Sequence, residues 1–297
     1  MENKKGNAHE KIIEKRVSYY YTVLKRFLKH GPGMFGLIVI MITLLLAIFA
    51  DDIAPFDPYE LNPRNRFQAP DRVHLMGTDN LGCDILSRII YGARYSMIIS
   101  ISVVIISMTI GVTLGLISGY YGGFVDEIVT RATDAFMAVP SFFIYITALS
   151  MWDVRGIWTI TLIMGIMMWP TFAKVVRSEV LSLKQRPYVE AGKSMGASDV
   201  RLIMRYILPN LFGSITIISS FRMAAAILTE TGLNFIGLGD PTICSWGSMI
   251  TRAHRSGAQL TFWWATLFPG LAITIVTWAF NLFGDGLRDA LDIKTVT

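Results

Sequence analysis

The feature that most constrains the fold is a set of six long apolar stretches, each able to cross a membrane as a helix. A helix needs roughly 20 apolar residues to span about 30 Å of hydrocarbon. The composition agrees, because 53% of the 297 residues are hydrophobic, which is high for a soluble domain. The sequence therefore predicts an all-helical protein of the membrane, with spans near 33–53, 96–120, 128–150, 156–176, 208–236 and 262–283.

The third stretch is the least continuous of the six, because its first half carries four charges. We expect this half to be a solvated helix end, with a conformational role as the alternative. Prolines within the third and fourth stretches predict helix kinks, and a role at a gate is the alternative there. The charged residues are Asp126, Glu127, Arg131 and Asp134, and the prolines are Pro140 and Pro170.

Basic residues indicate the orientation. The first apolar run starts near residue 33, follows Lys and Arg residues and has no small-residue cleavage site, so we expect an uncleaved first span. Lys and Arg gather on cytoplasmic loops, so both termini are predicted to be cytoplasmic. The net charge of +5 is then a topology signal and gives no reason to expect nucleic acid as a partner. The basic residues before the first span are Lys4, Lys5, Lys11, Lys15, Arg16, Lys25, Arg26 and Lys29.

A polar segment between the fourth and fifth stretches, Tyr188 to Asn210, has the pattern helix, tight turn, helix. Gly196 separates the two helical runs, and Ser198 is a candidate cap for the second. Small residues leave one side of the first helix open to a partner, Glu190 is its charged contact, and Pro209 suits the start of a new helix. The small residues are Ala191, Gly192 and Gly196.

This segment resembles the cytoplasmic coupling loop of ABC importer permeases. In that pattern Gly192 stands where a second Ala is usual, and Tyr206 stands where Ile is usual, followed by Ile207. The resemblance implies that a partner ATPase grips a coupling loop at 177–209; an ordinary amphipathic surface helix is the alternative. The matching residues are Glu190, Ala191, Gly196, Leu208 and Pro209.

The largest loop, from Asp51 to about Arg94, starts with prolines and ends in a helical pattern. Thr78 or Asp79 is expected to cap the following helix. The apolar face of that helix predicts an amphipathic helix lying on the outer membrane surface. The predicted organisation is a cytoplasmic tail at 1–32, a first span at 33–54, an external loop at 55–94, a core at 95–284 and a cytoplasmic tail at 285–297.

The same loop resembles a signature of the oligopeptide/dipeptide/nickel permease family, in its C-type subunit, with Cys83 in place of the usual Arg. Further matches lie at 233–239, 245–247 and 284–289, so the resemblance runs from about residue 33 to 292. The signature residues are Gly77, Thr78, Asp79, Gly82, Asp84, Ser87, Arg88 and Gly92.

The resemblance implies a type I importer fold and one half of a translocation path for di- or oligopeptides, in a bacterial plasma membrane. The partners it implies are a homologous B-type permease, two cytoplasmic ATPase subunits, an external solute-binding protein and the lipid bilayer. ATP and Mg²⁺ would be used by the ATPase subunits, with no cofactor bound by this chain. Nickel or another small solute remains an alternative cargo.

Two charges lie within the fifth stretch, Arg222 and Glu230. Because charges inside a membrane are costly, they are candidates for the translocation path or an outer gate, and packing against a neighbouring subunit is the alternative. They would form a charge relay if the chain were an ion-coupled carrier, which is the competing class. A purely structural membrane subunit is the third function class that the sequence leaves open.

Several sites are absent from the sequence. It contains no G-x-x-x-x-G-K-[ST] phosphate loop, no G-x-S-x-G and no H-E-x-x-H, so we expect no enzymatic activity from this chain. The four histidines are scattered and predict no metal site. Cys83 and Cys244 are either unpaired thiols or a disulfide between outer loops.

Overall fold

The structure is a computed structural model that describes residues 21–152, 156–257 and 261–292. Within these ranges the chain is helical, without a β-strand, and one isolated bridge joins Thr78 and Asp84. The basic residues at positions 4 to 16, which predict the orientation, lie outside the described residues, as does the end of the predicted tail at 293–297.

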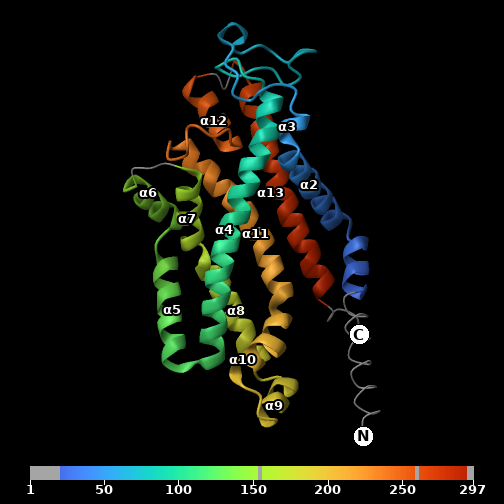
Figure 1. Cartoon of the computed structure of the whole chain (residues 1–297), viewed down its shortest axis with the longest axis vertical. Coiled ribbons are helices and arrows are strands. Elements are labelled where there is room, and N and C mark those ends of the chain that lie inside the picture. Colours follow the sequence, from blue (N-terminus) through green and yellow to red (C-terminus); the bar gives the residue numbers. More distant parts are fainter. Residues whose placement is uncertain (1–20, 153–155, 258–260, 293–297) are drawn as a thin grey trace.

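The helices form an elongated bundle, with loops at one end and a small helical projection at the other (Figure 1). We call these the loop end, formed by residues 51–84 and 237–257, and the coupling end, formed by residues 184–207. Residues 21–29 are also helical. The helices are α2 (Gly31–Ile48), α3 (Ala50–Ile53), η1 (Pro63–Asn65), α4 (Ile85–Tyr121), α5 (Gly123–Ala138), α6 (Ser141–Ser150), α7 (Ile157–Met167), α8 (Trp169–Leu183), α9 (Pro187–Ser194), α10 (Asp199–Leu202), η2 (Ile203–Ile207), α11 (Leu208–Phe235), α12 (Trp246–Arg255) and α13 (Trp264–Leu291).

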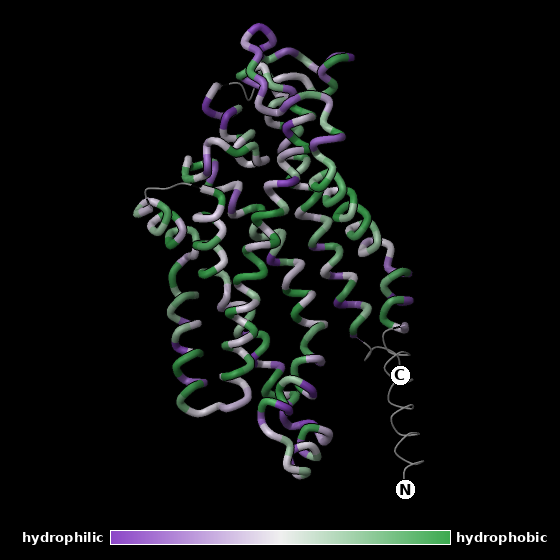
Figure 2. The backbone as a smooth tube through the Cα atoms, in the orientation of Figure 1, coloured by the Kyte–Doolittle hydropathy of each residue, from purple (hydrophilic) through white to green (hydrophobic). Residues whose placement is uncertain are grey.

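Five helical segments in the described ranges are long and apolar enough to span a membrane: α2, α4, 157–183, 199–235 and α13. A sixth arises if α5 and α6 form one span, and these two helices meet at an angle of 83°. The fold prediction is confirmed as an all-helical, multi-pass membrane protein. Figure 2 shows apolar residues along the middle of the long helices, with hydrophilic residues at both ends.

Prolines explain the breaks between α5 and α6 and between α7 and α8. Val139, which precedes Pro140, is extended (φ −96°, ψ 129°), as a residue before proline prefers, and α5 ends there. Pro170 occupies the first turn of α8, immediately after the junction with α7 at Met168. Both predicted kinks are confirmed, and the kink at Pro140 is large enough to break the third predicted span.

The predicted surface helix before the second span is wrong. Residues from Ile85 onward are the first turns of α4, which continues without interruption to Tyr121. Ile85 and Ile90 are buried, at 0% and 4% exposure, and the Trp246 side chain of α12 packs on the same part of α4. The apolar face expected to meet lipid is therefore covered by the protein itself.

Two further boundaries differ from the prediction. Asp84, rather than Thr78 or Asp79, caps α4, because its Oδ2 accepts a 2.8 Å hydrogen bond from the Ser87 backbone N–H. At the other terminus α13 extends to Leu291, so most of the predicted tail is helical. Close packing favours this extension, since a Cβ placed at Gly286 would lie 2.8 Å from the Cα of Gly33 in α2.

Helix α4 is central to the bundle and packs against α2, α7, α8 and α11. Its closest approach is to α8, where a Cβ at Gly111 would lie 2.5 Å from the Trp169 carbonyl oxygen and one at Gly115 would lie 2.7 Å from that of Ala173. Small residues permit such contact between helices in lipid. Large apolar side chains on α2 and α13 face outward instead, as membrane contact requires; they include Phe35, Ile38, Met41, Leu271, Ile275 and Trp278.

Candidate functional site

The coupling end has the predicted helix–turn–helix geometry. Helix α9 ends at Ser194, the chain turns at Gly196, and α10 begins at Asp199. Gly196 has φ +78°, a left-handed conformation in which glycine ends a helix without strain. Ser198 occupies the N-cap position of α10 but makes no side-chain capping bond, so the prediction is confirmed in position only.

Three large apolar side chains are exposed on this projection, among exposed charged residues that include Lys193 and Arg201. Met195, Val200 and Met204 are 77%, 67% and 57% exposed. Glu190 and Ala191 are exposed beside them. Exposed apolar side chains surrounded by polar and charged ones are typical of a protein-binding surface.

Gly192 does not lie on this open surface, which corrects the prediction. It is buried, and a Cβ there would lie 2.9 Å from Leu202 Cδ2 and 3.8 Å from Tyr206 Cζ. Gly192 and Tyr206, the two departures from the coupling-loop pattern, therefore pack against each other. The close contact that favours glycine at this position is with Leu202, and Tyr206 lies at ordinary contact distance.

The projection is joined to a membrane-spanning helix without a loop. Helix α10 continues through the π-helical turn η2 into α11, giving one helical segment from Asp199 to Phe235. Pro209 lies in the first turn of α11, and the Asn210 side chain donates a 2.6 Å hydrogen bond to the Tyr206 carbonyl. Such wide turns frequently occur at functional positions.

Two contacts attach the coupling end to α4. The Tyr120 hydroxyl hydrogen bonds to Asp199 Oδ1 at 2.6 Å, and Lys184 Nζ donates to the Gly119 carbonyl at 2.9 Å. They join the end of α4 to both sides of α9. A displacement of α9–α10 would therefore move the end of α4 as well.

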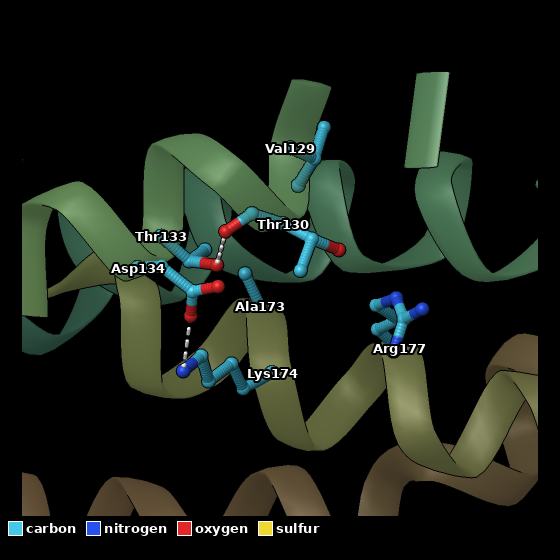
Figure 3. Close-up of a pocket in the computed structure, with 7 residues that line it drawn as sticks. All are labelled: Val129, Thr130, Thr133, Asp134, Ala173, Lys174 and Arg177. Carbon is cyan, nitrogen blue, oxygen red and sulfur yellow. Dashed lines mark hydrogen bonds and ion pairs between the residues drawn. The ribbon is translucent and has the colours of Figure 1, made fainter. Parts of the chain in front are cut away.

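Ion pairs also join α5 to α8. Arg177 binds the Asp126 carboxylate through two nitrogens, and Lys174 Nζ lies 2.7 Å from Asp134 Oδ1. Asp134 is exposed, as expected of a solvated helix end, whereas Asp126 is half-buried beside Arg177 of α8. Figure 3 shows the Asp134–Lys174 pair and Arg177 at a pocket between the two helices, lined by Val129, Thr130, Thr133, Asp134, Ala173, Lys174 and Arg177.

The two charged residues of the fifth span are not brought together. Eight residues of helix place Arg222 and Glu230 roughly 12 Å apart along its axis. Arg222 Nη2 donates to Thr171 Oγ1 at 2.7 Å, whereas Glu230 is 3% exposed and its Oε1 accepts a 2.5 Å bond from Asn234. No direct relay links these groups.

The signature residues of the loop end form a buried polar network. Asp79 Oδ1 accepts hydrogen bonds from the backbone N–H groups of Leu81 (2.8 Å) and Cys83 (3.0 Å), and its Oδ2 pairs with Arg88. Thr78 Oγ1 accepts from the Gln68 N–H at 2.8 Å, and its carbonyl accepts from Trp264 of α13 at 3.2 Å. The signature therefore folds the loop back on itself and onto α13.

Asp84 and Ser87 extend the same network. Asp84 Oδ1 lies 3.0 Å from His74 Nδ1, and the Ser87 hydroxyl accepts a 3.0 Å bond from the Phe56 N–H. Gly82 has φ +78°, and a Cβ there would lie 1.8 Å from the Asn62 carbonyl oxygen, so only glycine fits. These residues hold the loop in shape, and their side chains are too deeply buried to meet a partner.

Cys83 and Cys244 are buried free thiols, which selects the unpaired alternative. Burial raises the pKa of the Cys83 thiol to about 11, and it also raises the pKa of Cys244. Arg88 Nε donates to Cys244 Sγ at 3.2 Å, so Cys244 belongs to the polar network.

Sequence reasoning missed a second group of polar residues at the loop end. Arg252 and Arg255 of α12 lie three residues apart, a spacing that places both on one face of a helix, and they line a pocket with Asn80 and Asn234. That spacing was the available signal. The described ranges contain no group of three or more His, Cys, Asp or Glu residues able to hold a metal ion.

Two family models match this chain. One, "Binding-protein-dependent transport system inner membrane component", covers residues 111–296, and the other, "N-terminal TM domain of oligopeptide transport permease C", covers residues 18–70.

Similar curated proteins span nearly the whole chain. The oligopeptide transport system permease protein of Bacillus subtilis is 39% identical over 97% of this chain and 94% of its own length. The dipeptide transport system permease protein of Alkalihalophilus pseudofirmus is 36% identical, covering 94% of this chain and 91% of that protein. The glutathione transport system permease protein of Pectobacterium atrosepticum is 38% identical, covering 91% and 89%.

Proposed function

The chain belongs to the family of inner-membrane components of binding-protein-dependent transport systems, and we propose that it forms half of the path through which an ABC importer takes up short peptides. The observation that carries this proposal is the exposed α9–α10 projection, which continues directly into spanning helix α11. The peptide cargo is inferred from relatives named as oligopeptide and dipeptide permeases.

The proposed complex contains a homologous B-type permease, two ATPase subunits and an external solute-binding protein. ATP and Mg²⁺ act in the ATPase subunits, and this chain contributes no catalytic group. We assign the coupling end and both termini to the cytoplasm of a bacterial cell, and the loop end to the outside. The K/R-rich segment 174–205 supports this orientation, because basic residues favour the cytoplasmic side.

Helix α9 transmits the motion of the ATPases in this proposal. Glu190 and the apolar patch of Met195, Val200 and Met204 dock on an ATPase subunit. Closure of the ATPases then displaces α9–α10. Because α10 is continuous with α11, and Tyr120 links Asp199 to α4, the displacement reaches two spanning helices at once. Their movement opens the path outward.

The first test is co-purification from detergent-solubilised membranes. Wild type is compared with Glu190→Lys and Gly196→Trp, and ATPase subunits are identified by mass spectrometry. Glu60→Lys is the matched control, because it makes the same charge change at an exposed position of the loop end. We expect wild type and the control to retain the ATPases and the two coupling variants to lose them.

Uptake assays complete the test. Transport that stops on ATP depletion and survives collapse of ion gradients supports the ABC proposal. Transport with the opposite dependence, together with no co-purified ATPase, would replace it with an ion-coupled carrier. Transport that persists in both coupling variants would leave the projection without a transport role.

A further inference from the structure

The pocket at the loop end has the size of a small-molecule site. It lies between the outer loop, the end of α11, the segment after it and α12, and its volume is about 510 Å³. Pockets for small ligands typically enclose about 300–1,000 Å³. Its polar lining residues are Asn80, Asn234, Asp240, Ser248, Thr251, Arg252 and Arg255.

The pocket carries excess positive charge. Among the ion pairs of the described residues, none includes Arg252 or Arg255. The carboxylate of Asp240 is engaged locally, since its Oδ1 accepts bonds from the Thr242 N–H (2.9 Å) and hydroxyl (2.6 Å). Two guanidinium groups thus face the pocket with no acidic partner of their own.

Arg252 is also held in place. Its Nη2 donates to the Pro241 carbonyl at 2.8 Å, which fixes the guanidinium plane and leaves its other N–H groups available. Its pKa is lowered, first by burial and then by the nearby positive charge of Arg88. A bound anion would offset both effects.

One residue that lines the pocket, Asn80, has an unused acceptor. Asn80 Oδ1 is buried and accepts no hydrogen bond from the residues that the structure describes. A buried, unpaired acceptor is costly, so turning the Asn80 amide toward a ligand N–H in the pocket would gain affinity. A simple anion satisfies the arginines alone, whereas the last residue of a peptide offers a carboxylate and an N–H close together.

We propose that this pocket receives the C-terminal end of a peptide, with Arg252 and Arg255 binding the terminal carboxylate and Asn80 turning its Oδ1 toward the pocket to accept the adjacent peptide N–H. The assignment rests on the proposed function and adds a substrate contact to it. In this proposal the permease itself binds the peptide at this pocket, and this contact is separate from the peptide site of the binding protein.

The test measures uptake of trialanine and of trialanine amide by the purified, reconstituted complex with its binding protein. The amide lacks the terminal carboxylate. Any preference of the binding protein itself is common to all permease variants, so the change in the ratio of the two uptake rates reports the permease alone. The variants are Arg252→Gln, Arg255→Gln and Arg255→Lys, with Arg72→Gln as an exposed control in the outer loop.

We expect each Gln variant to lower the trialanine-to-amide ratio about tenfold, the loss expected for a hydrogen-bonded charge pair. Arg255→Lys should lie between wild type and Arg255→Gln, and Arg72→Gln should match wild type. Size-exclusion chromatography and basal ATP hydrolysis establish that each complex is assembled.

An equal fall for both peptides would overturn the proposal, because the arginines would then bind an acidic side chain of the binding protein or serve only the fold. An unchanged ratio with unchanged rates would also overturn it. If the wild-type complex imports neither peptide, the peptide function itself fails. That result is distinct, because it appears before any variant is made.

Discussion

The hydroxyl of Tyr120, at the end of α4, hydrogen bonds to the Asp199 carboxylate at the start of α10, with an O–O distance of 2.6 Å. Helix α4 packs along α2, α7, α8 and α11. A movement of the coupling segment therefore reaches the centre of the bundle through this bond as well as through α11.

Removing this bond should weaken transmission while leaving assembly intact. We expect Tyr120→Phe to lower the number of peptides imported per ATP hydrolysed by about two- to twelvefold, since a hydrogen bond of this kind contributes about 0.5–1.5 kcal/mol. The measurement is uptake and ATP hydrolysis in the same proteoliposomes. Tyr121→Phe, which removes an exposed neighbouring hydroxyl, is the control, and an equal effect in both variants would contradict the prediction.

The turn at Gly196 sets the angle between α9 and α10. Space is not the constraint, because a Cβ at this position would meet no atom within 4 Å. The constraint is the backbone conformation, since φ is +78° and a left-handed conformation costs a non-glycine residue about 1–2 kcal/mol.

We therefore expect Gly196→Val to reduce co-purification of the ATPase subunits strongly and Gly196→Asn to reduce it little, because Asn tolerates this conformation. Quantitative mass spectrometry of the purified complexes measures the difference. Identical behaviour of the two variants would show that the turn does not determine docking.

The Asp79–Arg88 pair should be important for stability. Arg88 is 2% exposed, and removing one member of a buried pair leaves the other charge unsatisfied, at a cost of about 3–5 kcal/mol. Arg88→Gln should lower the thermal unfolding midpoint in detergent substantially. Arg131→Gln removes the exposed pair with Glu127 and should change the midpoint little. Equal shifts would contradict the role given to the network.

The two cysteines should be inert in the folded protein. We expect Cys83 and Cys244 to resist N-ethylmaleimide at about pH 7 in the native state and to react after denaturation, as peptide mass spectrometry would show. Rapid native labelling of either thiol would refute their burial.

A pH effect follows from the raised pKa of Cys83. Its folded pKa of about 11 exceeds the reference value of 9.0, so the unfolded chain ionises first. Its contribution to stability is therefore complete below pH 9 and is lost progressively as the pH rises towards about 11. The loss should be absent from Cys83→Ala in the same titration of the thermal midpoint.

The spans and the helix–turn–helix segment could be predicted because lipid and helix ends impose local rules on the sequence. Apolar length identifies a span, and glycine identifies a left-handed turn such as Gly196. Features that depend on partners far along the chain could not be read in this way. The surface helix was mispredicted because an apolar face at Ile85 meets α12 and α13 rather than lipid, and these alternatives share one pattern.

The candidate site shows the same division. Glu190 was predicted to be exposed at the coupling end and is exposed. Gly192 faces inward instead, because its burial depends on Leu202 and Tyr206 across the turn. Asp79 and Arg88 were predicted only as signature residues of the external loop, and the structure shows that they are buried against each other. Arg252 and Arg255 were passed over because their spacing indicates a shared helix face but not the pocket that this face lines.

The sequence by itself determined the all-helical membrane architecture, the family resemblance and the place of the coupling turn, since each depends on residues adjacent in the chain or on the hydrophobicity of a single helix. Only the tertiary structure decided which charges are paired, which glycines are buried against other side chains and where a pocket remains. Those outcomes depend on which surfaces meet when distant segments pack, and a buried pair such as Asp79 and Arg88 acquires its role only when neighbouring helices exclude water.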